Sequence, residues 1–264
     1  MPRLTSGLAV GVEVGLVGAA YVVAVWGAWA RLGPGRVVST WRAGCFVGGL
    51  LVAAGAVVGP MDGLADRSLP AHMTQHVLLM LVAGPLLAVG RPVEVLARLL
   101  PDRLRRSAMR GGARASRSAR GDGWPRWAAA TVTLHTVVML GWHVPALYQL
   151  AVRNEGVHGL EHLSMTVAAV VMWWVLLDAG RPRPAAGAVL ALFAADLPMT
   201  LLGVALMVSR TVWYPVYGTG LQGQQVAGAV LWGFGGALMV IEAVAVFAWW
   251  LSTSDDRVRP VPAG

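Results

Sequence analysis

The residues best suited to chemistry in this chain are its six histidines, which occur in only three of its apolar stretches. Two pairs have the spacing His-x3-His, which places both imidazoles on one face of a helix about one turn apart, where they can share an ion. The other two histidines lie eight residues apart in a third stretch. This distribution is typical of a metal site. The six residues are His72, His76, His135, His143, His158 and His162.

Methionines continue the histidine pattern along each of the three stretches. They stand three or four residues from a histidine, a spacing that a helix stacks on one face. Imidazole and thioether together suit copper, particularly Cu(I), whereas Mg²⁺ or Ca²⁺ would require carboxylates and carbonyls. The helical rise therefore predicts copper ligands in three layers. The outer layer is His72, His143 and His158, the middle layer His76, Met139 and His162, and the inner layer Met80, His135 and Met165.

Each of these residues also has a structural alternative. A histidine in a membrane helix commonly bonds to a neighbouring helix, and a stripe of methionines commonly packs in a core. A purely structural or proton-relay network of histidines therefore stays open beside metal binding. His135, the deepest histidine, is the member whose role as a ligand is most open.

Two acidic residues inside the apolar stretches need an explanation of their own. Glu161 directly precedes His162 and points about 100° away from it on a helix, which favours a partner of a ligand, or packing, over a ligand. Asp196 stands shortly before Pro198 in the middle of a stretch, where an ionisable group is costly and hence a functional candidate. Stabilisation of a helix break at Pro198 is the alternative.

Four further polar residues lie near the same end of the stretches. Gln224 and Gln225 begin the last apolar stretch and are expected to face the site. Asp62 and Asp66 precede His72 in a loop, where they are expected to collect a cation as it approaches. An ordinary solvated loop is the alternative for this acidic pair.

The composition indicates which elements must position these residues. Of 264 residues, 56% are hydrophobic and 13% are charged, and mean hydropathy is +0.62, so most of the chain lies in lipid. A single cysteine, Cys45, excludes chemistry by cysteine pairs within the chain. We predict one all-α membrane domain over residues 1–264, a polytopic bundle of seven transmembrane helices. The helices are expected at residues 8–30, 41–60, 72–90, 127–142, 157–178, 186–208 and 224–251.

Arginine supplies all 21 basic residues, and 17 of them lie in alternate loops or in the C-terminal tail. The positive-inside rule then places the N-terminus outside, the C-terminus in the cytoplasm and the histidines toward the outer face. It also explains the pI of about 11.1 without nucleic acid binding. Residues 91–126 hold ten arginines and are predicted as a basic cytoplasmic loop, with a short interfacial helix at 93–100 and a disordered linker at 111–118.

Six short motifs follow one another over roughly residues 60–250. They are His72–Met80 (HMTQHVLLM), His143–Tyr148 (HVPALY), Val157–Ser164 (VHGLEHLS), Asp196–Met199 (DLPM), Trp213–Pro215 (WYP) and Gln224–Gly228 (QQVAG). In this order they resemble the CtaG-type cytochrome c oxidase assembly proteins of bacteria. The resemblance implies a seven-helix plasma-membrane protein needed to assemble a haem-copper oxidase of the caa type by handling copper. It also implies that the motif histidines, Asp196 and the glutamine pair are shared family positions.

The expected function is that of an assembly factor and not of an enzyme. Copper would bind between the third, fourth and fifth helices and pass to an oxidase subunit. Expected partners are oxidase subunits, the lipid bilayer and a periplasmic or extracellular copper donor. One alternative is a haem-binding oxidoreductase or electron carrier with paired axial histidines such as His76 and His162. The other is a metal-ion transporter, which needs a polar path through the cytoplasmic half, where Glu242 is one of few polar residues.

Overall fold

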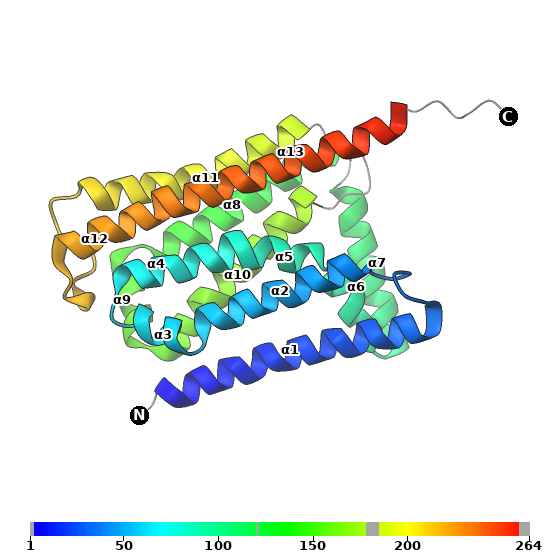
Figure 1. Cartoon of the computed structure of the whole chain (residues 1–264), viewed down its shortest axis with the longest axis horizontal. Coiled ribbons are helices and arrows are strands. Elements are labelled where there is room, and N and C mark those ends of the chain that lie inside the picture. The colour runs from blue at the N-terminus through cyan, green and yellow to red at the C-terminus, as the bar shows by residue number, and fades with distance from the viewer. Residues whose placement is uncertain (1–2, 120, 178–184, 259–264) are drawn as a thin grey trace.

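The computed structural model describes residues 3–119, 121–177 and 185–258, and every regular element within them is a helix. No strand occurs among these residues, which confirms the predicted all-α class. In Figure 1 most of the long helices run side by side along the longest axis of the molecule, and α7 (Asp102–Ser118) runs across one end of it. The longer helices are α1 (Arg3–Leu32), α2 (Thr40–Val57), α7 (Asp102–Ser118), α8 (Trp124–Trp142), α10 (Glu155–Leu177), α11 (Ala185–Val208) and α13 (Gly236–Val258). The shorter ones are α3 (Pro60–Ala65), α4 (Leu69–Val77), α5 (Gly84–Val89), α6 (Pro92–Leu96), α9 (Pro145–Arg153) and α12 (Gly220–Ala229).

The described residues contain six helices that are long and apolar enough to cross a membrane, or up to seven if a bent pair counts as one span. Two of these spans contain a wide π turn. The turn η1 (Leu78–Ala83) joins α4 to α5, and η5 (Val230–Gly235) joins α12 to α13. In a π turn each backbone hydrogen bond spans one residue more than in an α-helix. The side chains after the turn are therefore rotated about the helix axis relative to those of a regular α-helix. The two π turns lie in neighbouring spans, because α4 packs against η5.

The bent pair is the fourth predicted helix and its continuation. The helix α8 ends at Trp142, and α9 begins at Pro145 after a bend of 70°. Proline has no backbone N–H and disfavours helical backbone in the residue before it, so a straight helix cannot continue through Val144. His143 therefore occupies the C-cap of α8 and does not lie inside the helix.

The basic segment 91–126 is more ordered than its sequence predicts. Residues 111–118 belong to α7, so the predicted disordered linker was wrong. Alanine and arginine are strong helix formers and outweigh Gly111 and Gly112. Upstream, α6 and the turn η2 (Ala97–Leu99) form a helical stretch where a short helix was expected, and α7 packs against both.

Two groups of buried side chains hold the helices together. The larger group lies among α4, α8, α10, α11, α12 and α13 and includes Met73, Met139 and Trp173. The smaller group joins α1 and α2 to η1 and α5, and there Tyr21 stacks on Phe46. Large apolar side chains on the outer faces of the long helices remain exposed, as expected for surfaces in contact with lipid. The larger group fixes the relative position of α4, α8 and α10, which carry the histidines.

Small residues allow α11 and α12 to cross closely. A Cβ atom added at Gly203 would lie 2.8 Å from the carbonyl oxygen of Gly228 and 3.0 Å from the backbone nitrogen of Trp232. A Cβ atom added at Gly228 would press on the carbonyl oxygen of Gly203 in the same way. Because the obstacles are backbone atoms, neither helix can yield by a side-chain rotation. Close contacts between small residues are a common means of holding membrane helices together.

The Gly228→Ala substitution is therefore expected to destabilise the folded protein by about 1–3 kcal/mol, the usual cost of overpacking. Thermal unfolding in detergent measures the effect as a lowered midpoint. Gly233→Ala is the matched control, because a Cβ atom there meets nothing within 4 Å. Equal midpoints for the two variants would show that α11 and α12 do not depend on this crossing.

Candidate metal centre

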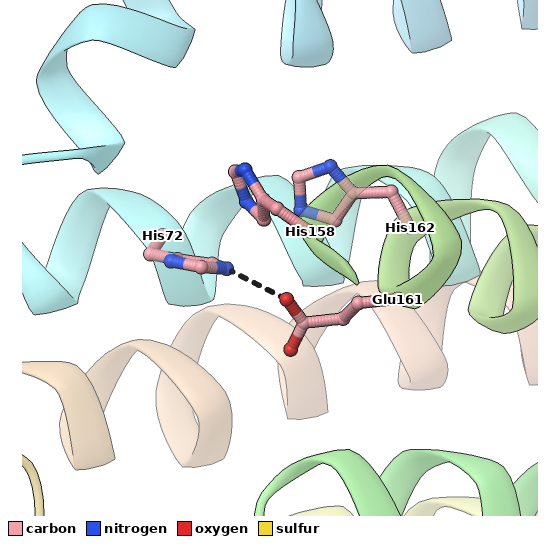
Figure 2. Close-up of side chains that lie close together, drawn as sticks. All are labelled: His72, His158, Glu161 and His162. Carbon is pink, nitrogen blue, oxygen red and sulfur yellow. Dashed lines mark ion pairs between the residues drawn. The ribbon is translucent and has the colours of Figure 1, made fainter. Parts of the chain in front are cut away.

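The two His-x3-His pairs meet face to face between α4 and α10. His72 and His76 lie on α4, and His158 and His162 lie near the start of α10. The ring centroids of His72 and His158 are 4.9 Å apart, and those of His76 and His162 are 5.3 Å apart. Figure 2 shows three of these rings gathered at the contact of the two helices. The helical spacing thus brings four imidazoles into one cluster.

A buried carboxylate completes this cluster. The Glu161 oxygens lie 3.6 Å from Nε2 of His72 and 3.7 Å from Nε2 of His76, and the side chain has no exposed surface. One ligand atom each from His72, His158, Glu161 and His162 lies within 4.8 Å of all the others. In Figure 2 the carboxylate points at the His72 ring. The spacing along the chain predicts Glu161 beside the ligands, whereas its carboxylate lies among them, because the His72 and His76 rings of α4 face Glu161.

The polar atoms of this cluster fit a bound cation. Nε2 of His72, both ring nitrogens of His76, Nε2 of His162 and both Glu161 oxygens are buried without a hydrogen-bond partner in the described part of the chain. The separations of 3.6 Å and 3.7 Å between imidazole and carboxylate exceed hydrogen-bond length. Unpaired polar groups in an apolar interior are costly, and native structures contain few of them. A metal ion bound among these atoms would satisfy the unpaired acceptors of several side chains at once.

Two tyrosines, Tyr217 and Tyr148, hold the His72 ring. The Tyr217 hydroxyl and Nδ1 of His72 share a hydrogen bond of 2.6 Å, and Tyr148 bonds to Tyr217 at 3.1 Å. Burial raises the pKa of Tyr217, so its hydroxyl stays protonated at neutral pH. The bond occupies Nδ1 and leaves Nε2 of His72 turned toward Glu161. Such outer partners orient metal-binding histidines and are part of most metal sites.

These tyrosines are not among the residues predicted from the sequence. Tyr148 lies inside the motif that begins at His143, so its position gave a signal that could have been used. Tyr217 lies in the short turn η4 (Pro215–Tyr217) and carries no local signal, because its contact with α4 depends on how the loop between α11 and α12 folds back. Gln75 was missed as well. Its amide donates to the Ala56 carbonyl at 2.7 Å and to Asp62 at 3.4 Å.

His143 borders the cluster, while His135 lies apart from it. The His143 ring is 5.3 Å from the ring of His76, and its Nδ1 is 2.7 Å from the carbonyl oxygen of Met139. His135 is buried deeper in α8 and has no ring contact with another histidine among the described residues. The three methionines of the predicted stripes are buried in the larger core group beside the cluster. They are Met80, Met139 and Met165.

The other polar residues singled out in the sequence make contacts of their own. Asp196 accepts a hydrogen bond of 3.0 Å from Thr200 one turn further along α11. Gln224 holds the loop between α11 and α12 in place, since its side chain accepts a hydrogen bond from the Trp213 backbone at 2.7 Å and donates one to the Thr211 carbonyl at 3.0 Å. Gln225 is exposed. The described contacts of these residues are thus structural and do not reach the histidine cluster.

A cavity of about 400 Å³ opens beside the cluster. Two site histidines, His158 and His162, line it, and three acidic side chains line it as well. His158 is only partly buried, unlike the other members of the cluster. The cavity therefore brings three carboxylates and the partly buried His158 to one opening. The acidic residues are Asp62, Asp66 and Glu155.

Comparison with known proteins assigns the chain to a family. No curated protein and no solved structure matches it significantly. The family model of the cytochrome c oxidase caa3 assembly factor matches residues 19–253, which include all six histidines and both halves of the cluster. The match covers nearly the whole chain and confirms the resemblance seen in the short motifs. The chain therefore belongs to the family of cytochrome c oxidase caa3 assembly factors.

Proposed function

We propose that this assembly factor binds copper in the cluster of His72, His158, Glu161 and His162 and passes it to an oxidase subunit. The observation that carries the proposal is the group of buried, unpartnered lone pairs contributed by α4 and α10. Imidazole is a good ligand for copper, and the anionic carboxylate offsets part of the charge of the ion. The family assembles a cytochrome c oxidase, and the haem-copper type that the short motifs imply makes copper the metal that such an oxidase needs.

Delivery of a metal requires a way in and out of a buried site. The cavity beside the cluster reaches the partly buried His158, and its acidic residues attract cations electrostatically. We assign Asp62 and Asp66, together with Glu155, to this approach. His158 is then the ligand that a donor or an acceptor reaches first.

The crowding of the cluster argues against the haem alternative. A haem held between His76 and His162 would require its macrocycle to fill the space between two rings that are 5.3 Å apart. The Glu161 carboxylate lies 3.7 Å from His76 in the same region. A single ion fits this space, and a porphyrin does not.

We place the copper site on the extracytoplasmic side of a bacterial plasma membrane. The arginine distribution supports this orientation, with the N-terminus outside and the C-terminus in the cytoplasm. The basic helix α7 then lies at the cytoplasmic surface, where anionic lipids attract arginine. Copper held near the outer face would be within reach of an extracytoplasmic donor and of the oxidase subunit that receives it.

Replacing Glu161 by Gln or His162 by Asn is expected to lower copper affinity at least about tenfold, since loss of even an outer partner of a ligand costs that much. Copper per purified protein, measured by elemental analysis against a competing chelator, checks this, and oxidase assembly in the membrane should fall in parallel. His135→Asn is the matched control, because this buried histidine lies outside the cluster. Undiminished copper binding by the cluster variants would refute the site.

The double substitution Asp62→Asn and Asp66→Asn should slow copper uptake about tenfold and reduce its dependence on ionic strength, because the attracting field is weakened. The amount bound at equilibrium should change little. Stopped-flow measurement with a chelated copper donor gives the rate. Asp102→Asn, an exposed carboxylate on α7, serves as the control. Equal rates in the double variant and the wild-type protein would remove this acidic pair from the approach.

Cysteine labelling at two exposed glycine positions, in a Cys45→Ser background, tests the orientation of the protein in the membrane. A Cβ atom meets nothing within 4 Å at Gly63, near the histidines, or at Gly111, in the basic helix α7. In intact cells an impermeant maleimide should label Gly63→Cys, and it should label Gly111→Cys only after the membrane is opened. The opposite labelling pattern would place the histidine cluster on the cytoplasmic side.

A further inference from the structure

A second group of metal-binding atoms lies on the other side of His76. His143 directs Nδ1 at the Met139 carbonyl oxygen, 2.7 Å away, and a carbonyl can only accept, so Nδ1 carries the proton and donates. In the neutral imidazole, Nε2 then holds a bare lone pair. This Nε2 lies 3.3 Å from the thioether sulfur of Met73, which also has no proton to give. Two acceptors thus face each other with no donor between them.

His76 supplies a third lone pair beside this contact. Its ring is 5.3 Å from the His143 ring and stands almost perpendicular to it, at 82°. The side chain has no exposed surface, and both of its ring nitrogens lack a hydrogen-bond partner in the described part of the chain. Two imidazoles and one thioether therefore lie next to one another in the buried interior. Neither Met73 nor His143 has an ion pair or a hydrogen bond with a carboxylate among the described residues, whereas His72 and His76 lie 3.6 Å and 3.7 Å from the Glu161 oxygens.

The distance between the two acceptors is the one expected for two ligands of the same ion. With metal–nitrogen bonds of about 2.0 Å and metal–sulfur bonds of about 2.3 Å, a nitrogen and a sulfur atom 3.3 Å apart subtend an angle at the ion near that of a tetrahedral site. Thioether and imidazole ligands select Cu(I) over Zn²⁺ and over the hard cations.

We infer that Met73, His143 and His76 form a second copper position, selective for Cu(I), beside the carboxylate-containing centre. The inference rests on the proposed function only for the identity of the metal. His76 lies between the two positions, since it is 3.7 Å from Glu161 on one side and contacts the His143 ring on the other. An ion can therefore move from one position to the other by exchanging ligands around His76, with no change in its oxidation state.

Met73 distinguishes this position from the predicted stripe of ligands. It follows His72 directly, so it points to a different face of α4, toward the end of α8. The ordinary alternative is packing, because Met73 is fully buried in the larger core group. Met73→Leu separates the two roles, since leucine conserves the volume and removes the sulfur.

Copper(I) binding by the full-length chain in detergent, under reducing conditions, tests the second position. A Cys45→Ser background leaves methionine as the only source of sulfur. We expect two Cu(I) per chain and a sulfur neighbour of copper in X-ray absorption. Met73→Leu should lose one equivalent and the sulfur signal and keep the other equivalent. Met172→Leu, an equally buried methionine of α10, should keep both.

The outcomes separate this inference from the proposed function. Two equivalents and an intact sulfur signal in Met73→Leu would overturn the second position, as would a single equivalent without sulfur in the parent protein. Loss of one equivalent in Glu161→Gln with the sulfur signal retained would support both positions. Unchanged binding in Glu161→Gln, together with loss in Met73→Leu, would overturn the first position and leave the second standing.

Discussion

A carboxylate enclosed by imidazoles is the constraint on which the contact between α4 and α10 depends. Glu161 has no exposed surface, and neither of its oxygens has a hydrogen-bond partner within the described chain. A bare charge in such surroundings is expensive, so the side chain requires a proton or a cation close by. His72 and His76 face it from α4 at distances that leave room for an ion. Metal binding at the proposed centre would therefore be linked to the side-chain contact between α4 and α10, and an ion bound there would stabilise the fold by mass action.

Backbone irregularities decide which of the predicted ligands can reach this carboxylate. The predicted stripes assume 3.6 residues per turn throughout. That holds for His72 and His76, which lie in the regular part of α4, but Met80 falls inside the π turn η1, where the spacing changes. His143 was expected on the same stripe as Met139, yet α8 ends one residue before it because of Pro145. Proline gave a sequence signal for that bend, whereas the residues around the π turn gave none.

The sequence predicts contacts along a helix better than contacts between helices. The spacing of the four paired histidines, the apolar stretches and the order of the motifs were enough to predict the fold class, the family and a cluster on α4 and α10. Met73, Tyr217 and the direction of Glu161 were not predictable in the same way, because each depends on how a neighbouring helix or loop is placed. Gln224 illustrates the opposite case, a residue that the sequence singles out but that lies outside the cluster. It belongs to one of the short motifs, and its side chain holds the loop between α11 and α12 through Trp213 and Thr211.

Hydrogen bonds from neighbouring groups fix two of the histidine rings, whereas a third ring has none. His72 has Nδ1 bound to Tyr217, and His143 has Nδ1 bound to the Met139 carbonyl, so each presents Nε2 to the interior. Tyr214 adds rigidity at the bend by donating to the His143 carbonyl at 2.6 Å. His76 lacks a hydrogen-bond partner at either nitrogen within the described residues. His76 is the ring that lies between the Glu161 carboxylate and the Met73 thioether. In the proposed pair of copper positions, His72 belongs to one and His143 to the other, and His76 is the ligand that both can share.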